Sequence, residues 1–114
     1  MEILSFDGLT GQPVEAFGSV GVTAQAVFHS AAVGVTVLRV SAGGEVGRHP
    51  APVDQLLMVI EGHGVVQADD GDAVSVRAGQ AVVWRAGEEH TTRAVDDLTA
   101  VVIEVAAAPQ RRQE

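Results

Sequence analysis

The chain has 114 residues, a formal net charge of −8 at pH 7 and no cysteine. This length fits one domain with one core, and the lack of cysteine excludes disulfides, thiolate metal ligands and cysteine nucleophiles. The negative charge, set against seven arginines and no lysine, disfavours binding to nucleic acid or to an anionic membrane surface. No run of about 18 apolar residues is present, and the acidic start MEILSFDG lacks the basic region of a signal peptide. We therefore expect a soluble, cytoplasmic protein, and the Ala, Val, Gly and Arg bias is typical of a GC-rich bacterial genome.

The first part of the chain predicts an arm followed by strands. Residues 1–22 alternate weakly and are rich in turn-forming residues, which we interpret as short edge strands or a loose arm. Such an arm covers a sheet edge or pairs with a second subunit. Residues 23–28 and 34–41 are rich in β-branched residues and predict two strands. Between them, His29 is expected at the surface.

The next stretch carries the first candidate ligand. A Gly43-Gly44 pair predicts a turn after residue 41, followed by a short strand over residues 45–51 that contains His49. Pro50 has no N–H to donate, so this strand is expected at an edge or a bulge.

The run QLLMVIE, which begins at Gln55, predicts a strand buried on both faces. Because successive side chains of a strand alternate, Gln55, Leu57 and Val59 share one face. We expect Leu57 and Val59 to line a pocket inside the fold. Met58 and Ile60 lie on the other face, which a partner subunit or the N-terminal arm would cover.

The rest of the chain also reads as short strands with frequent turns. Strands are expected at residues 65–68, 73–76, 81–84, 89–95 and 98–105, followed by a polar tail over residues 109–114. The acidic turn at Asp69 lacks the ligand spacing of a calcium loop. Trp84 is expected in the core, Arg85 at the surface and His63 in a turn. No amphipathic helix is evident, so the sequence predicts an all-β sandwich or barrel.

Four residues could together hold a divalent metal. Glu88 lies two residues before His90, so the two side chains share a face of an extended chain. With His49 and Gln55 they would supply two imidazoles, a carboxylate and an amide oxygen. The alternative is that His49 and His90 hydrogen-bond Gln55 inside the protein without a metal.

Residues 43–62, which contain His49 and Gln55, resemble a motif of the cupin superfamily of small β-barrels. That motif runs Gly, five residues, His, one residue, His, three or four residues, Glu, six residues, Gly. Here Gly43, His49 and Gly62 match it, Ala51 takes the place of the second His, and Gln55 takes the place of the Glu.

Residues 79–94, which contain Glu88 and His90, resemble the second cupin motif. That motif runs Gly, five residues, Pro, one residue, Gly, two residues, His, three residues, Asn. Here Gly79, Gly87 and His90 match it, with Arg85 in the Pro position and Ala94 in the Asn position. The resemblance implies a cupin-type jelly-roll β-barrel, also called a double-stranded β-helix, formed by a single domain over residues 1–108 with an N-terminal arm.

The resemblance also implies a site. In metal-binding cupins the four ligand positions hold manganese, iron, nickel, zinc or copper inside the barrel. Here Ala51 cannot bind metal, and Gln55 keeps an oxygen donor but removes a negative charge, which weakens binding to a dication and leaves any bound metal a stronger Lewis acid.

Three hypotheses follow. The first is a small homodimeric cupin that binds a divalent metal and a small organic molecule, with oxygenase, isomerase or lyase-type chemistry if it is an enzyme. The second is a metal-free binding or sensory module that holds an apolar ligand without turnover. The third is a structural partner that acts through its dimer face.

Overall fold

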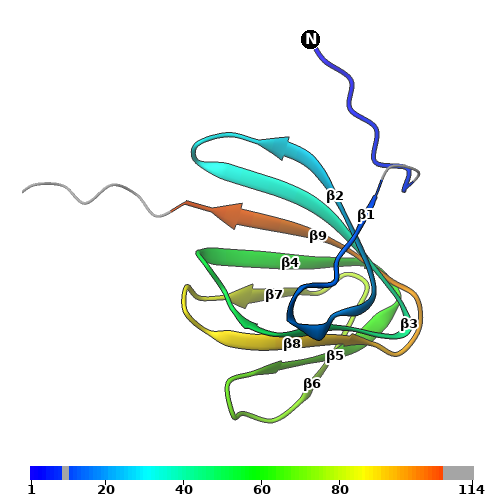
Figure 1. The fold of residues 1–114 in the computed structure, drawn as a ribbon, viewed down its shortest axis with the longest axis vertical. Coiled ribbons are helices and arrows are strands. Elements are labelled where there is room, and N and C mark those ends of the chain that lie inside the picture. The colour runs from blue at the N-terminus through cyan, green and yellow to red at the C-terminus, as the bar shows by residue number, and fades with distance from the viewer. Residues whose placement is uncertain (9–10, 107–114) are drawn as a thin grey trace, which may run out of the picture.

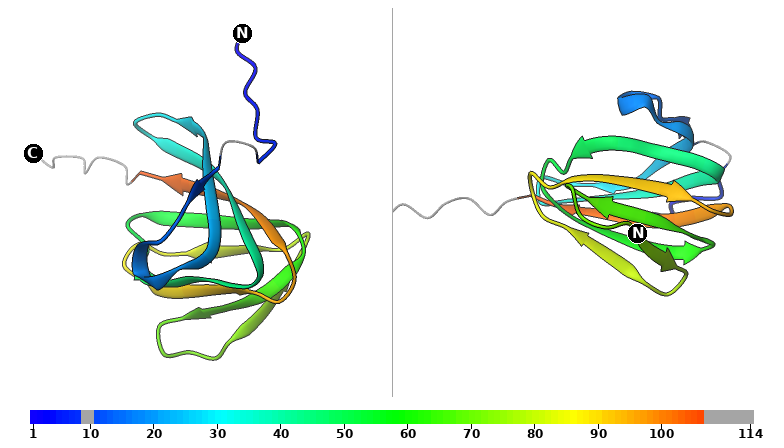
Figure 2. Two further views of the ribbon diagram at one scale, coloured as in Figure 1. Left: turned by 45° about the vertical axis from the view of Figure 1, so that its right-hand side comes forward. Right: turned by 90° about the horizontal axis from the view of Figure 1, so that it is seen from below.

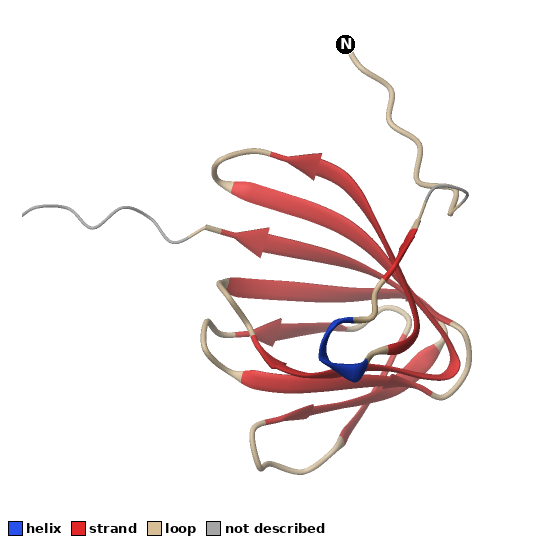
Figure 3. Cartoon of the chain, in the orientation of Figure 1, coloured by secondary structure: helices blue, strands red, loops and turns tan. Residues whose placement is uncertain are grey.

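Strands are the main secondary structure of the described residues. The computed structural model describes residues 1–8 and 11–106, in which nine strands and one short 3₁₀ turn are found (Figures 1 and 3). The elements are β1 (Gln12–Pro13), η1 (Ala16–Gly18), β2 (Val20–His29), β3 (Val33–Pro50), β4 (Asp54–Glu61), β5 (His63–Ala68), β6 (Val74–Arg77), β7 (Ala81–Trp84), β8 (Glu89–Ala94) and β9 (Leu98–Val105). No helix of the described residues is long and apolar enough to cross a membrane. The tail expected at 109–114 lies outside the described residues.

The strands form a curled antiparallel sheet whose two halves face each other (Figures 1 and 2). Neighbouring strands follow the order β6-β5-β8-β3-β9-β4-β7, and β1 and β2 are added beside β3. This arrangement confirms the predicted all-β jelly-roll barrel. Closing a sheet on itself leaves an interior that short side chains can fill, which suits a chain with few aromatic residues.

The prediction of two strands with a turn at Gly43-Gly44 is wrong. β3 continues through both glycines and has 18 residues. Its first part pairs with β9 up to the Val40–Leu98 pair, and its last part pairs with β8 from the Glu45–Arg93 pair onward. The positive φ of 80° at Gly43 therefore produces a bend that takes one strand from one half of the barrel to the other.

The edge position predicted for the residues around Pro50 is confirmed. In this part of β3, His49 and Pro50 pair only with β8, and the register shifts between Val46 and His49. An edge strand tolerates proline because the missing N–H would point away from the sheet.

The core lies between the two halves of the barrel and consists mainly of aliphatic side chains. Its central members include Val40, Leu57, Val59, Leu98 and Ala100, all nearly inaccessible to water. Each such aliphatic side chain of Val or Leu size contributes about 1.5–3 kcal/mol by burial. The alternation predicted for β4 is confirmed, since its odd-numbered residues from Gln55 to Val59 face inward.

The outer face of the β9–β4 half of the barrel is apolar and partly uncovered. Met58 and Ile60 are 37% and 50% exposed, so β4 is not buried on both faces in the single chain. The N-terminal arm crosses β2 and β3 instead. There, Arg39 Nη2 donates a hydrogen bond to Phe6 O at 2.6 Å, and Gln25 Nε2 donates one to Ser5 O at 3.4 Å. The arm thus covers a different part of the outer face from the part that Met58 occupies.

Candidate functional site

His49, Gln55 and His90 line one cavity of about 220 Å³ inside the barrel. His49 and His90 are direct antiparallel partners on β3 and β8. Gln55 reaches the cavity from β4 in the other half of the barrel. The three residues are far apart in sequence, and the closure of the sheet brings their side chains to the same space.

The cavity wall is mostly apolar with a few polar groups. Leu57, a predicted lining residue, contributes to it. Val59, the other predicted lining residue, is buried in the core and is not among the lining side chains. The reason is distance along β4, because Val59 lies two residues beyond Leu57 and roughly 6–7 Å deeper in the barrel.

Backbone carbonyl groups fix both imidazoles in the same tautomer. His49 Nδ1 lies 2.7 Å from Gly47 O, and His90 Nδ1 lies 3.1 Å from Glu88 O. A carbonyl oxygen only accepts hydrogen bonds, so each Nδ1 carries a proton, and in the neutral imidazole Nε2 then keeps the lone pair. Histidines that bind metals are held in this way, with one ring nitrogen donating to a carbonyl and the other free to coordinate.

Burial keeps His90 in the form that can coordinate. His90 is 5% exposed, and this burial lowers its pKa, as does the neighbouring His49, while the bond to the Glu88 carbonyl opposes the change. A lowered pKa favours the neutral imidazole at pH 7.

Four aromatic rings follow one another along the cavity, as two stacked pairs, Phe17–His49 and His90–Trp84, whose imidazoles meet at a tilt of 56°. The Phe17 and His49 ring centroids are 4.7 Å apart, those of His49 and His90 are 4.4 Å apart, and those of His90 and Trp84 are 4.4 Å apart. Trp84 is buried as predicted, and its Nε1 has no hydrogen-bond partner among the described residues. These contacts restrict the rotation of both imidazoles about their side-chain bonds.

Glu88, the fourth predicted ligand, is not brought into the cavity. Its Oε1 accepts a hydrogen bond from the Arg85 backbone N–H at 3.0 Å, which closes the turn before β8. The prediction that the Glu88 and His90 side chains share a face holds only for an extended chain. Glu88 precedes β8 and belongs to this turn. As expected, Arg85 is exposed, and it lies 3.6 Å from an Asp54 carboxylate oxygen.

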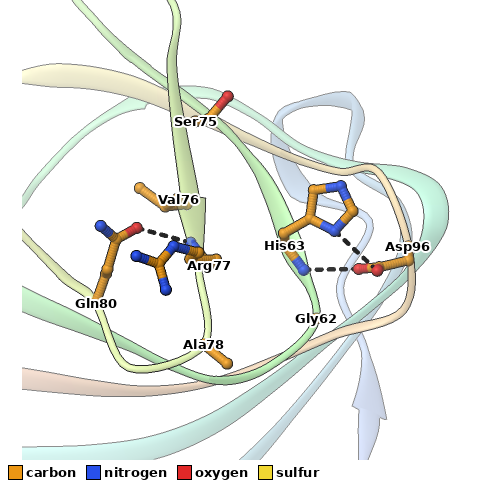
Figure 4. A pocket seen from close by; sticks show the side chains of 8 residues that line it. All are labelled: Gly62, His63, Ser75, Val76, Arg77, Ala78, Gln80 and Asp96. Carbon is orange, nitrogen blue, oxygen red and sulfur yellow. Dashed lines mark hydrogen bonds and ion pairs between the residues drawn. The ribbon is translucent and has the colours of Figure 1, made fainter.

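The other two histidines lie away from the cavity. His29 is exposed at the end of β2. His63 borders an open hollow of about 660 Å³ on the outside of β5 and β6 (Figure 4). In that hollow His63 Nδ1 pairs with Asp96 Oδ2 at 2.8 Å, and Gln80 Oε1 accepts a hydrogen bond from the Arg77 backbone N–H. These groups are engaged in holding turns, so the larger hollow is not the candidate site.

Phe17 and Glu104 are two of the several lining residues that the sequence does not single out. Phe17 belongs to η1, in a segment interpreted only as a loose arm, and it contacts the cavity because η1 packs on β3. Glu104 also lines the cavity, from β9. The even-numbered residues of β9 face inward, and this alternation in LTAVVIEV is the signal that could have identified Glu104.

The donor set in the cavity fits a divalent transition metal. Two imidazole Nε2 atoms suit zinc, copper, nickel and iron, and the Gln55 amide oxygen adds a hard donor. Ala51, in the place of the second motif histidine, is buried in the core and supplies no donor. No group of three or more His, Asp or Glu side chains arranged to hold a metal is present in residues 1–8 and 11–106.

The fold occurs in many solved structures. The polyketide cyclase RemF from Streptomyces resistomycificus has a TM-score of 0.83 and 19% identity, covering 96% of this chain and 82% of its own. A predicted oxalate decarboxylase from Thermotoga maritima has a TM-score of 0.78 and 20% identity, covering 92% and 100%. KdgF from Halomonas sp. has a TM-score of 0.76 and 19% identity, covering 93% and 96%.

No curated protein matches the chain in sequence. The family model described as the cupin domain matches residues 36–106, which include both motif stretches and strands β4 to β9 entire. With this match and the jelly-roll barrel that the structure shows, the chain belongs to the cupin domain family.

Proposed function

We propose that the barrel cavity binds a divalent transition metal together with a small organic molecule. The observation that carries this proposal is the pair of imidazoles, His49 and His90, held by backbone carbonyls with both Nε2 atoms free. Gln55 Oε1 is the third donor, and water completes the coordination.

The organic ligand occupies the apolar remainder of the cavity. A volume of about 220 Å³ is below the range of about 300–1,000 Å³ typical of drug-sized ligands, so the ligand is small. Leu57 and Val102 contact its apolar part from the β4–β9 side, and Phe17 covers it from η1.

In the catalytic form of this proposal, a bound metal supplies Lewis acidity to an oxygen atom of the substrate. His49 and His90 hold their lone pairs in fixed directions, and the apolar wall excludes water from the reacting atoms. The similar solved structures include a polyketide cyclase and a predicted oxalate decarboxylase. One fold thus carries different chemistries, and the residues of the site, more than the fold, determine the reaction.

A second candidate function is a metal-free binding module. Two observations favour it: Ala51 removes one imidazole of the family motif, and the cavity wall is mostly apolar. In that case His49, Gln55 and His90 hydrogen-bond the polar group of an apolar ligand that is not turned over.

One measurement separates the two functions. The protein is purified without a histidine tag, and its metal content is measured by mass spectrometry for the wild type, His90→Ala and His29→Ala. We expect close to one metal ion per chain in the wild type and in the exposed-histidine control His29→Ala, and almost none in His90→Ala. Metal absent from all three, with no thermal stabilisation by Mn, Fe, Ni, Zn or Cu, would leave the metal-free module as the function.

We further propose that the protein is a homodimer. The register of the sheet places Val37, Val101 and Met58 in one row on the outer face of the barrel. A neighbouring row consists of Val35, Ile103 and Leu56. Two adjacent apolar rows on a partly exposed sheet face are typical of a protein interface, and a second copy presents the same rows.

A further inference from the structure

The sheet register places the one carboxylate of the cavity wall directly beside Gln55. Glu104 on β9 is the antiparallel partner of Gln55 on β4 and, on its other side, of Gly34 on β3. Side chains of directly paired residues have Cβ atoms about 4.5–5.5 Å apart. Glu104 and Gln55 both face inward and both line the cavity with His49 and His90.

Neither of these two side chains is satisfied by the protein. Within residues 1–8 and 11–106, the Glu104 carboxylate and the Gln55 amide make no hydrogen bond or ion pair. Gln55 is 9% exposed and Glu104 is half-buried. Trp84 Nε1 is the only fully buried side-chain polar atom without a partner in the described residues, so the polar atoms of Gln55 and Glu104 remain accessible from the cavity and available to a bound species.

We propose that Glu104 supplies, through Gln55, the negative charge that the metal site otherwise lacks. This inference rests on the proposed metal-binding function. The Gln55 amide has two ends. When Oε1 binds the metal, Nε2, which has no partner among the described residues, turns to donate a hydrogen bond to the Glu104 carboxylate. That hydrogen bond makes Oε1 a stronger donor, so the pair together replaces one carboxylate ligand.

Glu104 is thus a positioning residue and not a direct ligand. The described residues contain no group of three His, Asp or Glu side chains arranged to hold a metal, which is consistent with a carboxylate outside the coordination shell. Partners of this kind orient the ligand and raise its basicity, and their loss weakens metal binding. If Glu104 acts on the metal through the Gln55 amide, its effect on metal affinity has to disappear in the Gln55→Glu variant, which has no amide at this position.

This requirement defines a double-mutant cycle. The affinity for Ni²⁺ is measured for the wild type, Glu104→Gln, Gln55→Glu and the double variant by quenching of the fluorescence of Trp84, the only tryptophan of the chain. We expect Ni²⁺ to bind about 10–100-fold more weakly to Glu104→Gln, which is the range for loss of an outer-shell partner, and more tightly to Gln55→Glu. In the Gln55→Glu background, Glu104→Gln is expected to change the affinity by less than about threefold.

The control is Glu61→Gln, which removes the same charge from an exposed position of β4 outside the cavity and is expected to bind Ni²⁺ as the wild type does. Should Glu104→Gln fail to fold, Glu104→Asp keeps the charge at a shorter reach and is expected to bind about 3–10-fold more weakly.

Three results would overturn the inference. Wild-type affinity in the folded Glu104 variants would show that Glu104 plays no part. An equal loss with Gln and with Glu at position 55 would show that Glu104 does not act through Gln55. Both results leave the proposed metal site standing, whereas failure of the wild type to bind Ni²⁺, Mn²⁺, Zn²⁺, Fe²⁺ or Cu²⁺ would remove the metal site and the inference together.

Discussion

At the scale of single residues, Gly47 determines how close η1 comes to the cavity. The backbone carbonyl of Phe17 lies against Gly47, in the space that a Cβ would occupy. The Gly47 N–H donates to Ser19 Oγ at 3.1 Å, which holds the same segment from its other end. Phe17 itself has a φ of 59°, a conformation that a bulky residue adopts only when its surroundings compensate. The contact with Gly47 and the stack on His49 provide that compensation.

Gly47→Ala is expected to destabilise the protein by about 1–3 kcal/mol, because the added methyl group collides with the Phe17 carbonyl and overpacks the contact. Urea denaturation measures the change. The matched control is Gly34→Ala, where the added methyl group would be 3.8 Å from the nearest atom, a side-chain carbon of His29. That control is expected to stay within about 0.5 kcal/mol of the wild type. Equal stability of both variants would show that η1 moves away from β3 without cost.

At the scale of elements, two aspartates connect the turn between β8 and β9 with the β4–β5 junction and with the bend of β3. Asp96, in the turn between β8 and β9, accepts hydrogen bonds from the His63 backbone N–H at 2.6 Å and from His63 Nδ1 at 2.8 Å (Figure 4). Asp97 Oδ1 accepts one from the Ala42 N–H at 2.8 Å, at the bend of β3. Gly62 allows this approach, since a Cβ there would meet the Asp97 carbonyl. The expectation that His63 is a turn residue is wrong, since His63 is the first residue of β5, directly after Gly62.

The Asp96 contacts predict a pH-dependent contribution to stability. The bond from the His63 backbone N–H is the main reason that the pKa of Asp96 lies below its usual value. A carboxylate whose pKa is lower in the folded than in the unfolded state stabilises the protein above the unfolded pKa of about 3.9. This contribution is lost as the pH falls through the folded pKa.

We therefore expect Asp96→Asn to be less stable than the wild type at pH 7 and to approach it near pH 3. Urea denaturation at both pH values measures the difference. Asp72→Asn, at an exposed position in the turn between β5 and β6, is the control for loss of one negative charge. A difference between Asp96→Asn and the wild type that is as large at pH 3 as at pH 7 would contradict this account.

At the scale of the whole molecule, the two faces of the β9–β4 half of the barrel have different roles. The inner face carries Gln55 and Glu104 into the cavity, and the outer face carries the apolar rows around Met58. Because successive residues of a strand alternate between these faces, a shift in register by one residue would exchange them. The dimer proposed above would therefore pack on the same strands that build the site.

Met58→Glu is expected to convert the dimer to a monomer at micromolar concentration, because it places a charge in the centre of an apolar interface. Sedimentation equilibrium measures the mass. Val74→Glu adds the same charge at an exposed position on β6, in the other half of the barrel, and is expected to remain dimeric. A wild type that sediments only as a monomer would refute the proposed interface.

Much of the fold could be predicted from the sequence, because the information is local. The alternation around Leu57, the turn signals and the spacing of the motif glycines indicated nearly every strand and the barrel type. The Gly43-Gly44 pair predicts a turn where the structure has a bend within β3, because a glycine pair gives the same local signal in both cases. The pairing of distant strands is not visible in the local sequence. The expected pairing comes from the resemblance to cupins.

The candidate site could be predicted less completely. His49, Gln55 and His90 stood at motif positions, so their convergence was expected. Glu104 lies in no motif, and its place beside Gln55 depends on the pairing of β4 with β9, which only the three-dimensional structure reveals. The prediction of Glu88 as a ligand rests on alternation along an extended chain, and this alternation does not hold through a turn.

The central position of β9 has a consequence for how the protein is made. β9 is the last strand of the described chain, yet it lies between β3 and β4 and pairs with both. Until residues 98–105 leave the ribosome, β3 and β4 each have an unpaired inner edge, and unpaired strand edges are prone to association with other chains. The barrel therefore assembles late, and folding to the native state has to wait for the end of translation of its final strand.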